Sequence, residues 1–159
     1  MEVMELIERL GKKLPRFPDG RIDYSKSRIA PVITVFVKYK EKILLIKRSG
    51  KVGTYKGKWH TVAGYLDEVK PVREKVLEEL REEIGIVSGI RSIRIEKSFE
   101  VKDRVIGKTW IVHPVLVELE GEPKIKLDWE HTEFRWIKPG NLKNFDTIPG
   151  IHKTLEKLF

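Results

Sequence analysis

The chain has 159 residues, 32 of them lysine or arginine against 24 aspartate or glutamate, and a formal net charge of +8. This length suits one domain with a sizeable core. The absence of cysteine excludes a disulfide framework and a thiolate metal site. Because no apolar run approaches about 18 residues and the start lacks a signal-peptide pattern, we expect a cytoplasmic protein with no membrane partner. The basic balance favours anionic partners, with a merely well-solvated surface as the alternative.

The first 28 residues are expected to pack on a domain that spans residues 29–159. An amphipathic helix is predicted over residues 2–13, with apolar residues on one stripe and Gly11 and Pro15 as its limits. Residues 14–28 are rich in proline, glycine, aspartate and serine, which predicts an extended connection. This connection would either cover the sheet or contribute to a homodimer.

The remainder of the chain alternates β-branched, apolar segments with turn signals, which predicts strands around one long helix. We expect strands at 31–39, 43–47, 59–62, 91–101, 108–119 and 134–137, and a terminal helix at about 150–158. The strand at 91–101 is expected to end in a turn near Lys102 and Asp103. The basic, glycine-spaced loop from Arg48 to Lys58 suits a phosphate, or is simply mobile surface. This order indicates an α/β (α+β) sandwich.

The long helix carries Glu79, Glu82 and Glu83 on one side, because positions i, i+3 and i+4 share a face. Apolar residues at four-residue spacing lie beside them and are expected to pack against the sheet. Gly85 is expected to end the helix. Three neighbouring carboxylates repel one another unless a cation lies among them, and oxygen ligands suit Mg²⁺ or Mn²⁺. The alternative is an ordinary solvated acidic face.

The stretch from Gly64 to Ile86 resembles the Nudix box, the signature of the Nudix hydrolases. That signature is a glycine, five residues, a glutamate, seven residues, and then R-E-U-x-E-E-x-G-U, where U is apolar. Seven of its nine positions match: Gly64, Glu79, Leu80, Glu82, Glu83, Gly85 and Ile86. Two positions depart from it, because Lys70 replaces the first glutamate and Glu78 replaces the arginine.

The resemblance covers roughly residues 30–158 and implies the Nudix fold, a mixed β-sheet sandwiched between helices. It also implies hydrolysis of a diphosphate bond in a nucleoside diphosphate derivative, with Mg²⁺ or Mn²⁺ as cofactor. By position, Glu79, Glu82, Glu83 and the carbonyl of Ala63 would be the metal ligands. The three glutamates, with Glu130 from a later loop, would be the catalytic residues. Glu130 is otherwise an ordinary loop acid, and its neighbour His131 could contact substrate instead.

Substrate contacts are expected from residues around the box. Arg48 ends the second predicted strand and is placed to reach a phosphate. Tyr65 follows the box glycine and would lie near the metal or pack under the turn. The aromatic rings of Phe99, Trp110 and Trp129 are candidates for stacking on a base or sugar, with a place in the core as the alternative for each.

The two departures from the signature are opposite charges with their signs exchanged. We therefore predict a structural pair in which Lys70 and Glu78 face each other and brace the loop against the helix. The alternative is two unrelated surface charges.

The leading hypothesis is therefore a metal-dependent Nudix pyrophosphohydrolase that acts on a small nucleotide. The missing first glutamate supports a second class, a Nudix-fold module that binds or senses a nucleotide without efficient turnover. The net charge suggests a third class, an enzyme that acts on the end of RNA. Nucleic acid is less favoured as a partner because the lysines are scattered over the whole chain.

Overall fold

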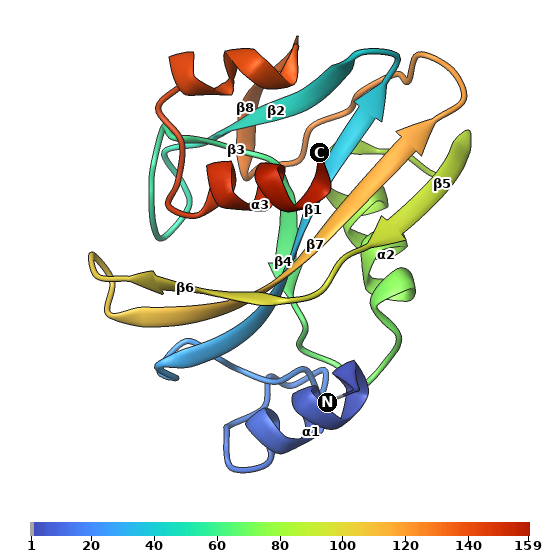
Figure 1. Ribbon diagram of the computed structural model, residues 1–159. Coiled ribbons are helices and arrows are strands. Elements are labelled where there is room, and N and C mark those ends of the chain that lie inside the picture. Colours follow the sequence, from blue (N-terminus) through green and yellow to red (C-terminus); the bar gives the residue numbers. More distant parts are fainter. Residues whose placement is uncertain (1) are drawn as a thin grey trace.

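The sheet is built around two long strands that run parallel to each other, β1 (Ile29–Tyr39) and β7 (Lys108–Leu119). Their register extends from Ile29 opposite Thr109 to Lys38 opposite Glu118. Figure 1 shows them crossing the centre of the protein in the computed structural model, which describes residues 2–159. The path through the sheet is β3-β2-β1-β7-β5, with β4 on β1, β6 on β7 and β8 on β2. Apart from β1 and β7, the paired strands are antiparallel.

The other strands are shorter. They are β2 (Lys42–Arg48), β3 (Trp59–His60), β4 (Val62–Tyr65), β5 (Ile90–Ile95), β6 (Phe99–Asp103) and β8 (His131–Ile137). Three helices, α1 (Val3–Gly11), α2 (Val72–Ile84) and α3 (Ile151–Leu158), and a 3₁₀ helix, η1 (Pro139–Asn144), accompany them. Among the described residues, no helix is long and apolar enough to span a membrane.

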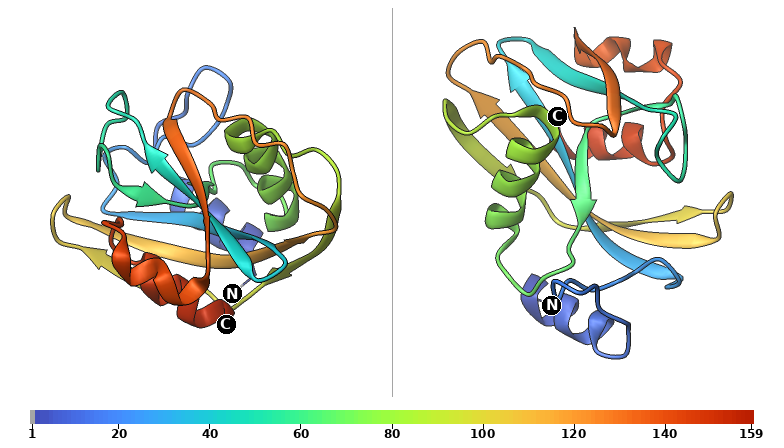
Figure 2. Two further views of the ribbon diagram at one scale, coloured as in Figure 1. Left: turned by 90° about the horizontal axis from the view of Figure 1, so that it is seen from above. Right: turned by 180° about the vertical axis from the view of Figure 1, so that it is seen from behind.

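Each face of the sheet is covered by helices, because side chains alternate along the central strands. Val35 and Val37 of β1 join one buried cluster with Val76 and Leu80 of α2, whereas Phe36 joins a second cluster that includes Ile151 of α3. Figure 2 shows α2 and α3 on opposite sides of the sheet. The predicted mixed sheet between helices is therefore confirmed.

The strand predicted at 91–101 is wrong in one respect, because it is two strands, β5 and β6, with a break between them. The break lies opposite Pro114 in the middle of β7, whose carbonyl accepts a hydrogen bond from the N–H of Glu96 at 2.9 Å. Proline has no N–H to return, so the ladder is interrupted there. The predicted strand at 59–62 is likewise divided at Thr61, where the chain passes from pairing with β2 to pairing with β1.

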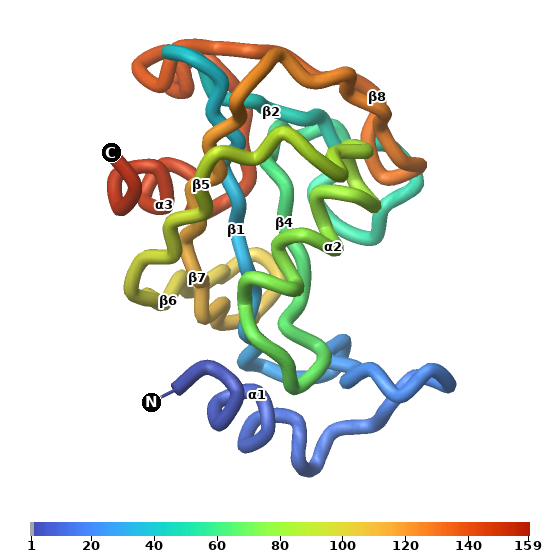
Figure 3. The backbone as a smooth tube through the Cα atoms, turned by 90° about the vertical axis from the view of Figure 1, so that its right-hand side faces the viewer, coloured from blue at the N-terminus to red at the C-terminus, as the bar shows by residue number. Residues whose placement is uncertain are grey.

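The N-terminal segment lies against the loop that precedes α2 (Figure 3). The N–H of Ile22 donates to the carbonyl of Asp67 at 2.8 Å, and the Tyr24 hydroxyl donates to the carbonyl of Leu66 at 2.8 Å. The end of α1 packs on the same segment, since a Cβ added at Gly11 would lie 2.4 Å from Cδ1 of Ile22. Residues 12–24 are called the N-terminal arm below.

Helix α2 places the acidic residues. Val76, Leu80 and Ile84 are fully buried along one side of it. The helix ends at Gly85, whose left-handed φ of 73° turns the chain so that the N–H of Ile86 donates to the carbonyl of Leu80 at 3.1 Å. The buried stripe fixes the rotation of α2, so Glu79 and Glu83 project toward β4.

Candidate active site

The turn at the end of β4 touches α2 at the box glycine. A Cβ added at Gly64 would lie 2.8 Å from both Cδ and Oε1 of Glu79. That separation is below any normal carbon contact, so only glycine lets the strand and the glutamate approach this closely. Gly64 therefore leaves room for the Glu79 carboxylate to lie against the backbone of the turn.

Three carboxylates of α2 come together at this point. One oxygen from each of Glu78, Glu79 and Glu82 lies within 4.8 Å of the others, a grouping that a cation fits. Burial and the neighbouring charges of Glu79 and Glu78 raise the pKa of Glu82. The donor set consists of oxygen atoms on a packed helix, which suits Mg²⁺ or Mn²⁺.

Glu83 points inward from this group. Its Oε2 accepts a hydrogen bond from the N–H of Ala63 at 3.2 Å, and its Oε1 lies 3.7 Å from Nε2 of His131. His131 is in turn held by Asp128, with Nδ1 2.8 Å from Oδ1. Burial, and then the contact with Glu79, raises the pKa of Glu83 well above its usual range. Ala63, Glu79 and Glu83 are thus neighbours, and the imidazole of His131 lies next to Glu83.

Lys75 is a buried lysine that the sequence reasoning missed. Only 2% of its side chain is exposed, and its Nζ lies 3.1 Å from Oε1 of Glu79 and 3.1 Å from Oδ1 of Asp67. Burial alone lowers the pKa of a lysine, but the carboxylates of Glu79 and Asp67 outweigh it, so the pKa of Lys75 is raised. Its spacing was the signal in the sequence that could have revealed it, because Lys75 lies three and four residues before Glu78 and Glu79 on the same helix face.

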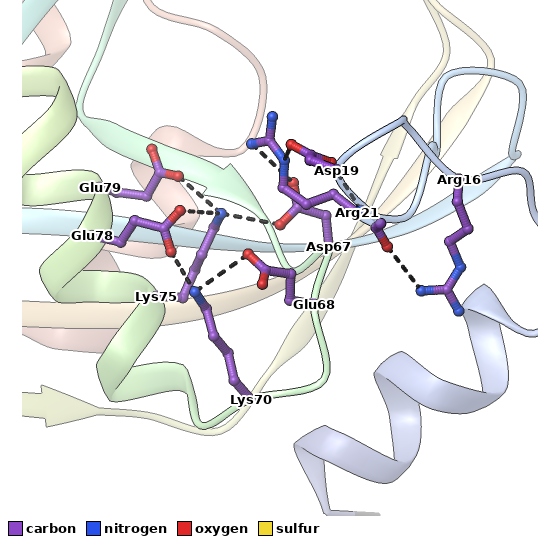
Figure 4. A network of polar contacts seen from close by, with 10 residues as sticks. Arg16, Asp19, Arg21, Asp67, Glu68, Lys70, Lys75, Glu78 and Glu79 are labelled. Carbon is purple, nitrogen blue, oxygen red and sulfur yellow. Dashed lines mark hydrogen bonds and ion pairs between the residues drawn. The ribbon is translucent and has the colours of Figure 1, made fainter.

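Lys70 and Glu78 meet across the junction of the loop and the helix (Figure 4). Nζ of Lys70 donates to Oε2 of Glu78 and also lies 3.4 Å from Oε1 of Glu68. Burial opposes the charge on Lys70, but Glu78 outweighs it and raises the pKa of Lys70. The opposite charges therefore lie together, although Glu78 also faces Lys75 at 3.7 Å.

The second neighbour of Glu78, Lys75, decides what happens when the charges of the pair are exchanged. Lys70→Glu alone should lower the hydrolysis rate, because the new carboxylate faces Glu78. Adding Glu78→Arg should recover the rate only in part, since the introduced guanidinium would lie beside Lys75. Loss of a supporting group of this kind costs about 10–100-fold. Steady-state rates of the single and double variants measure this, and a double variant as slow as Lys70→Glu alone would contradict a bracing role.

A cavity of about 360 Å³ opens beside the carboxylates. Its lining includes Arg48, His60, Ala63, Gly64, Tyr65, Glu79, Glu82, Trp110 and Glu130. Burial and the charge of Asp128 raise the pKa of Glu130 to about 6. The Arg48 guanidinium is partly committed, because Nε and Nη2 donate to the carbonyl of Thr54 at 3.0 and 2.9 Å. Arg48 therefore also anchors the loop at residues 49–58.

Aromatic rings form one wall of this cavity. Tyr65 and Trp110 lie with their ring centroids 5.9 Å apart, and Tyr24 of the N-terminal arm stacks on Tyr65 at 5.5 Å. The ammonium of Lys108 lies over both Tyr65 and Trp110, 5.6 and 5.1 Å from their centroids. Stacked rings with a cation over them are the kind of surface on which planar ligands stack in proteins.

The other two aromatic candidates lie elsewhere. Phe99 sits beneath α3, with the ammonium groups of Lys153 and Lys157 at 5.6 and 5.7 Å from its ring. The prediction that Phe99 stacks on substrate is therefore wrong, because β6 directs its ring toward α3 and not into the cavity. Trp129 does not line the cavity either, and 63% of it is exposed to solvent.

Further cavity residues come from segments that carried no motif. The Tyr55 hydroxyl bonds both oxygens of the buried Asp103, at 2.7 and 2.6 Å, and so joins the loop at 49–58 to β6. Arg21 reaches the cavity from the N-terminal arm. His60 is buried, and among the described residues its Nδ1 has no hydrogen-bond partner. The contacts of Tyr55 and Arg21 could not be predicted from the sequence, since each joins segments that are far apart in the chain.

Solved structures share this architecture. A MutT NUDIX hydrolase from Burkholderia pseudomallei superposes with a TM-score of 0.68 at 20% identity, covering 84% of this chain and all of that one. A bifunctional NMN adenylyltransferase/ADP ribose pyrophosphatase from Francisella tularensis, solved with AMP and a Mn ion, gives a TM-score of 0.65 at 21% identity. It covers 98% of this chain and 45% of its own. The sheet, helix and turn thus define a Nudix fold.

The sequence comparison identifies the family. The profile of the NUDIX domain matches residues 26–158, so the chain belongs to the NUDIX domain family, as the box predicted. A nucleoside triphosphatase, NudI of Escherichia coli O139:H28, is 22% identical over 118 residues, which are 70% of this chain and 84% of that protein. The chain is a Nudix-type pyrophosphohydrolase.

Proposed function

We propose that this protein hydrolyses the diphosphate bond of a nucleoside diphosphate derivative with the help of Mg²⁺ or Mn²⁺. The observation that carries the proposal is the contact between Gly64 and Glu79, where an added Cβ would fall 2.8 Å from the carboxylate. The turn and the acidic helix meet there, beside a cavity with an aromatic wall.

The proposed metal ligands are Glu79, Glu83, Glu82 and the carbonyl of Ala63. A divalent cation held there would supply positive charge for the diphosphate and would lower the pKa of the attacking water. The chain supplies position: α2 fixes Glu79 and Glu83, and the N–H of Ala63 keeps Glu83 turned toward β4. The protein's contribution is thus mainly orientation and charge.

Glu130 is the proposed general base. It lines the same cavity as Glu79, and its pKa of about 6 lies in the range where a carboxylate can accept a proton near neutral pH. Arg48 partly offsets that rise and keeps a positive charge beside Glu130. The remaining nitrogen of this guanidinium, Nη1, is proposed to contact a phosphate in the cavity.

The nucleoside is proposed to lie against Tyr65 and Trp110. Both rings line the cavity, and Lys108 gives this wall a positive charge that suits a phosphorylated ligand. The related structure from Francisella tularensis includes an ADP ribose pyrophosphatase and was solved with AMP, which is itself a phosphorylated nucleoside. ADP-ribose therefore heads the list of substrates to test.

A substrate panel tests the proposal. ADP-ribose, dinucleoside polyphosphates and nucleoside triphosphates are incubated with the protein and Mg²⁺ or Mn²⁺, and the products are separated by chromatography. We expect nucleoside monophosphate or pyrophosphate from at least one of them. Tight nucleotide binding with no turnover on the whole panel would instead support the binding module, which the replacement of the first box glutamate by Lys70 favours.

A further inference from the structure

Lys75 already places a positive charge inside the carboxylate group. Its Nζ faces Oε1 of Glu79 at 3.1 Å and Oε1 of Glu78 at 3.7 Å from within the same helix. A buried ammonium is tolerated only when acceptors surround it. Figure 4 shows the Lys75 ammonium directed between Glu79, Glu78 and Asp67. Glu79 therefore shares one oxygen with a resident cation.

Asp67 holds this ammonium from the other side. Its Oδ1 lies 3.1 Å from Nζ of Lys75, and its Oδ2 lies 3.8 Å from Nη1 of Arg21 in the N-terminal arm. The backbone of Asp67 is fixed as well, since its carbonyl accepts from the N–H of Ile22. The position of Lys75 is thus set by the loop and the arm as well as by α2.

We propose that Lys75 is a built-in cation of this carboxylate group, which shares the Glu79 carboxylate and thereby reduces the affinity of the group for a divalent ion. The inference rests on the proposed role of Glu79 as a metal ligand. Lys75 is a positioning residue, because it acts through Glu79. If Lys75 served only to hold the loop and Glu79 in place, its removal would loosen Glu79 and weaken metal binding.

Metal binding without substrate separates these two roles. Free Mn²⁺ is followed by electron paramagnetic resonance during titration of the wild type, Lys75→Met and Lys75→Arg. Lys75→Met removes a charge within about 4 Å of the ligand, so Mn²⁺ should bind at least about tenfold more tightly. Lys75→Arg keeps the charge and should bind like the wild type. Lys70→Met is the matched control, because Lys70 contacts Glu78 and Glu68, and it should change the affinity less.

Thermal unfolding gives the second readout. Without metal, Lys75→Met should unfold at a lower temperature than the wild type, because Glu78, Glu79 and Asp67 lose their shared counter-charge. Saturating Mn²⁺ should raise its midpoint by more than that of the wild type. If Lys75→Met does not fold alone, Mn²⁺ should restore it, and Lys75→Gln serves as a polar neutral variant for the same titration.

Equal or weaker Mn²⁺ binding by the neutral variants, or failure of Mn²⁺ to restore a variant that is unfolded without it, would overturn the inference. That result would leave the proposed function intact if the wild type still hydrolyses its substrate with metal. Absence of Mn²⁺ binding in the wild type would overturn the metal role of Glu79 itself, and this inference with it.

Discussion

Replacement of Glu79 by glutamine will lower metal-dependent hydrolysis by about 100-fold or more, because a neutral amide replaces the carboxylate that meets the box turn. Glu79 is the residue at which the separate contacts of the site converge. It touches Gly64 on the turn and Lys75 on its own helix, and it contributes an oxygen to the group formed with Glu78 and Glu82. Steady-state rates at saturating Mg²⁺ or Mn²⁺ measure the effect.

Glu74→Gln is the matched control for this change, since Glu74 is exposed in the first turn of the same helix. It should retain the wild-type rate. The fold of the Glu79 variant should persist, because Lys75 keeps Asp67 and Glu78 as partners. A Glu79→Gln protein that hydrolyses substrate as fast as Glu74→Gln would remove Glu79 from the proposed metal site.

Gly64→Ala should lower the hydrolysis rate nearly as much as Glu79→Gln does, although it adds only one methyl group and changes no charge. Its Cβ would fall 2.8 Å from Cδ and Oε1 of Glu79, so the carboxylate must move or the turn must withdraw. A displacement of about 1 Å at a catalytic group lowers rates by about 100-fold. The rate and the Mn²⁺ affinity of the variant should fall together.

Gly121→Ala controls for the loss of a glycine, because nothing lies within 4 Å of a Cβ placed there. Circular dichroism of both variants distinguishes local displacement from unfolding. Undiminished Mn²⁺ affinity in a folded Gly64→Ala protein would show that the close approach of the turn to Glu79 has no part in metal binding.

The sequence was sufficient to predict the layered fold, because its signals are local. β-branched segments, the stripe of Val76, Leu80 and Ile84, and the glycine cap at Gly85 each depend on neighbours a few residues away. The break between β5 and β6 was missed, since its cause is Pro114 on a strand that is distant in sequence. Local patterns do not record which residue of a partner strand lies opposite.

The residues of the candidate site could be predicted where the spacing of the box determines their positions. They could not be predicted where contacts between distant segments determine the direction of a side chain. Glu79, Glu82 and Glu83 follow from helical geometry, and the opposite charges of Lys70 and Glu78 suggested their contact. Lys75 was missed because flanking lysines on an acidic helix usually face solvent, whereas Asp67 draws this one inward. Phe99 was misplaced because the direction of a side chain depends on the register of β6 against β7.

The metal dependence of turnover tests the central claim most directly. The wild-type protein is treated with EDTA, assayed on the best substrate of the panel, and then titrated with Mg²⁺ and with Mn²⁺. Hydrolysis at the carboxylates of α2 predicts no turnover in EDTA and a saturable return of nucleoside monophosphate or pyrophosphate with either ion. Turnover that persists undiminished in EDTA, or none at any metal concentration, would contradict it.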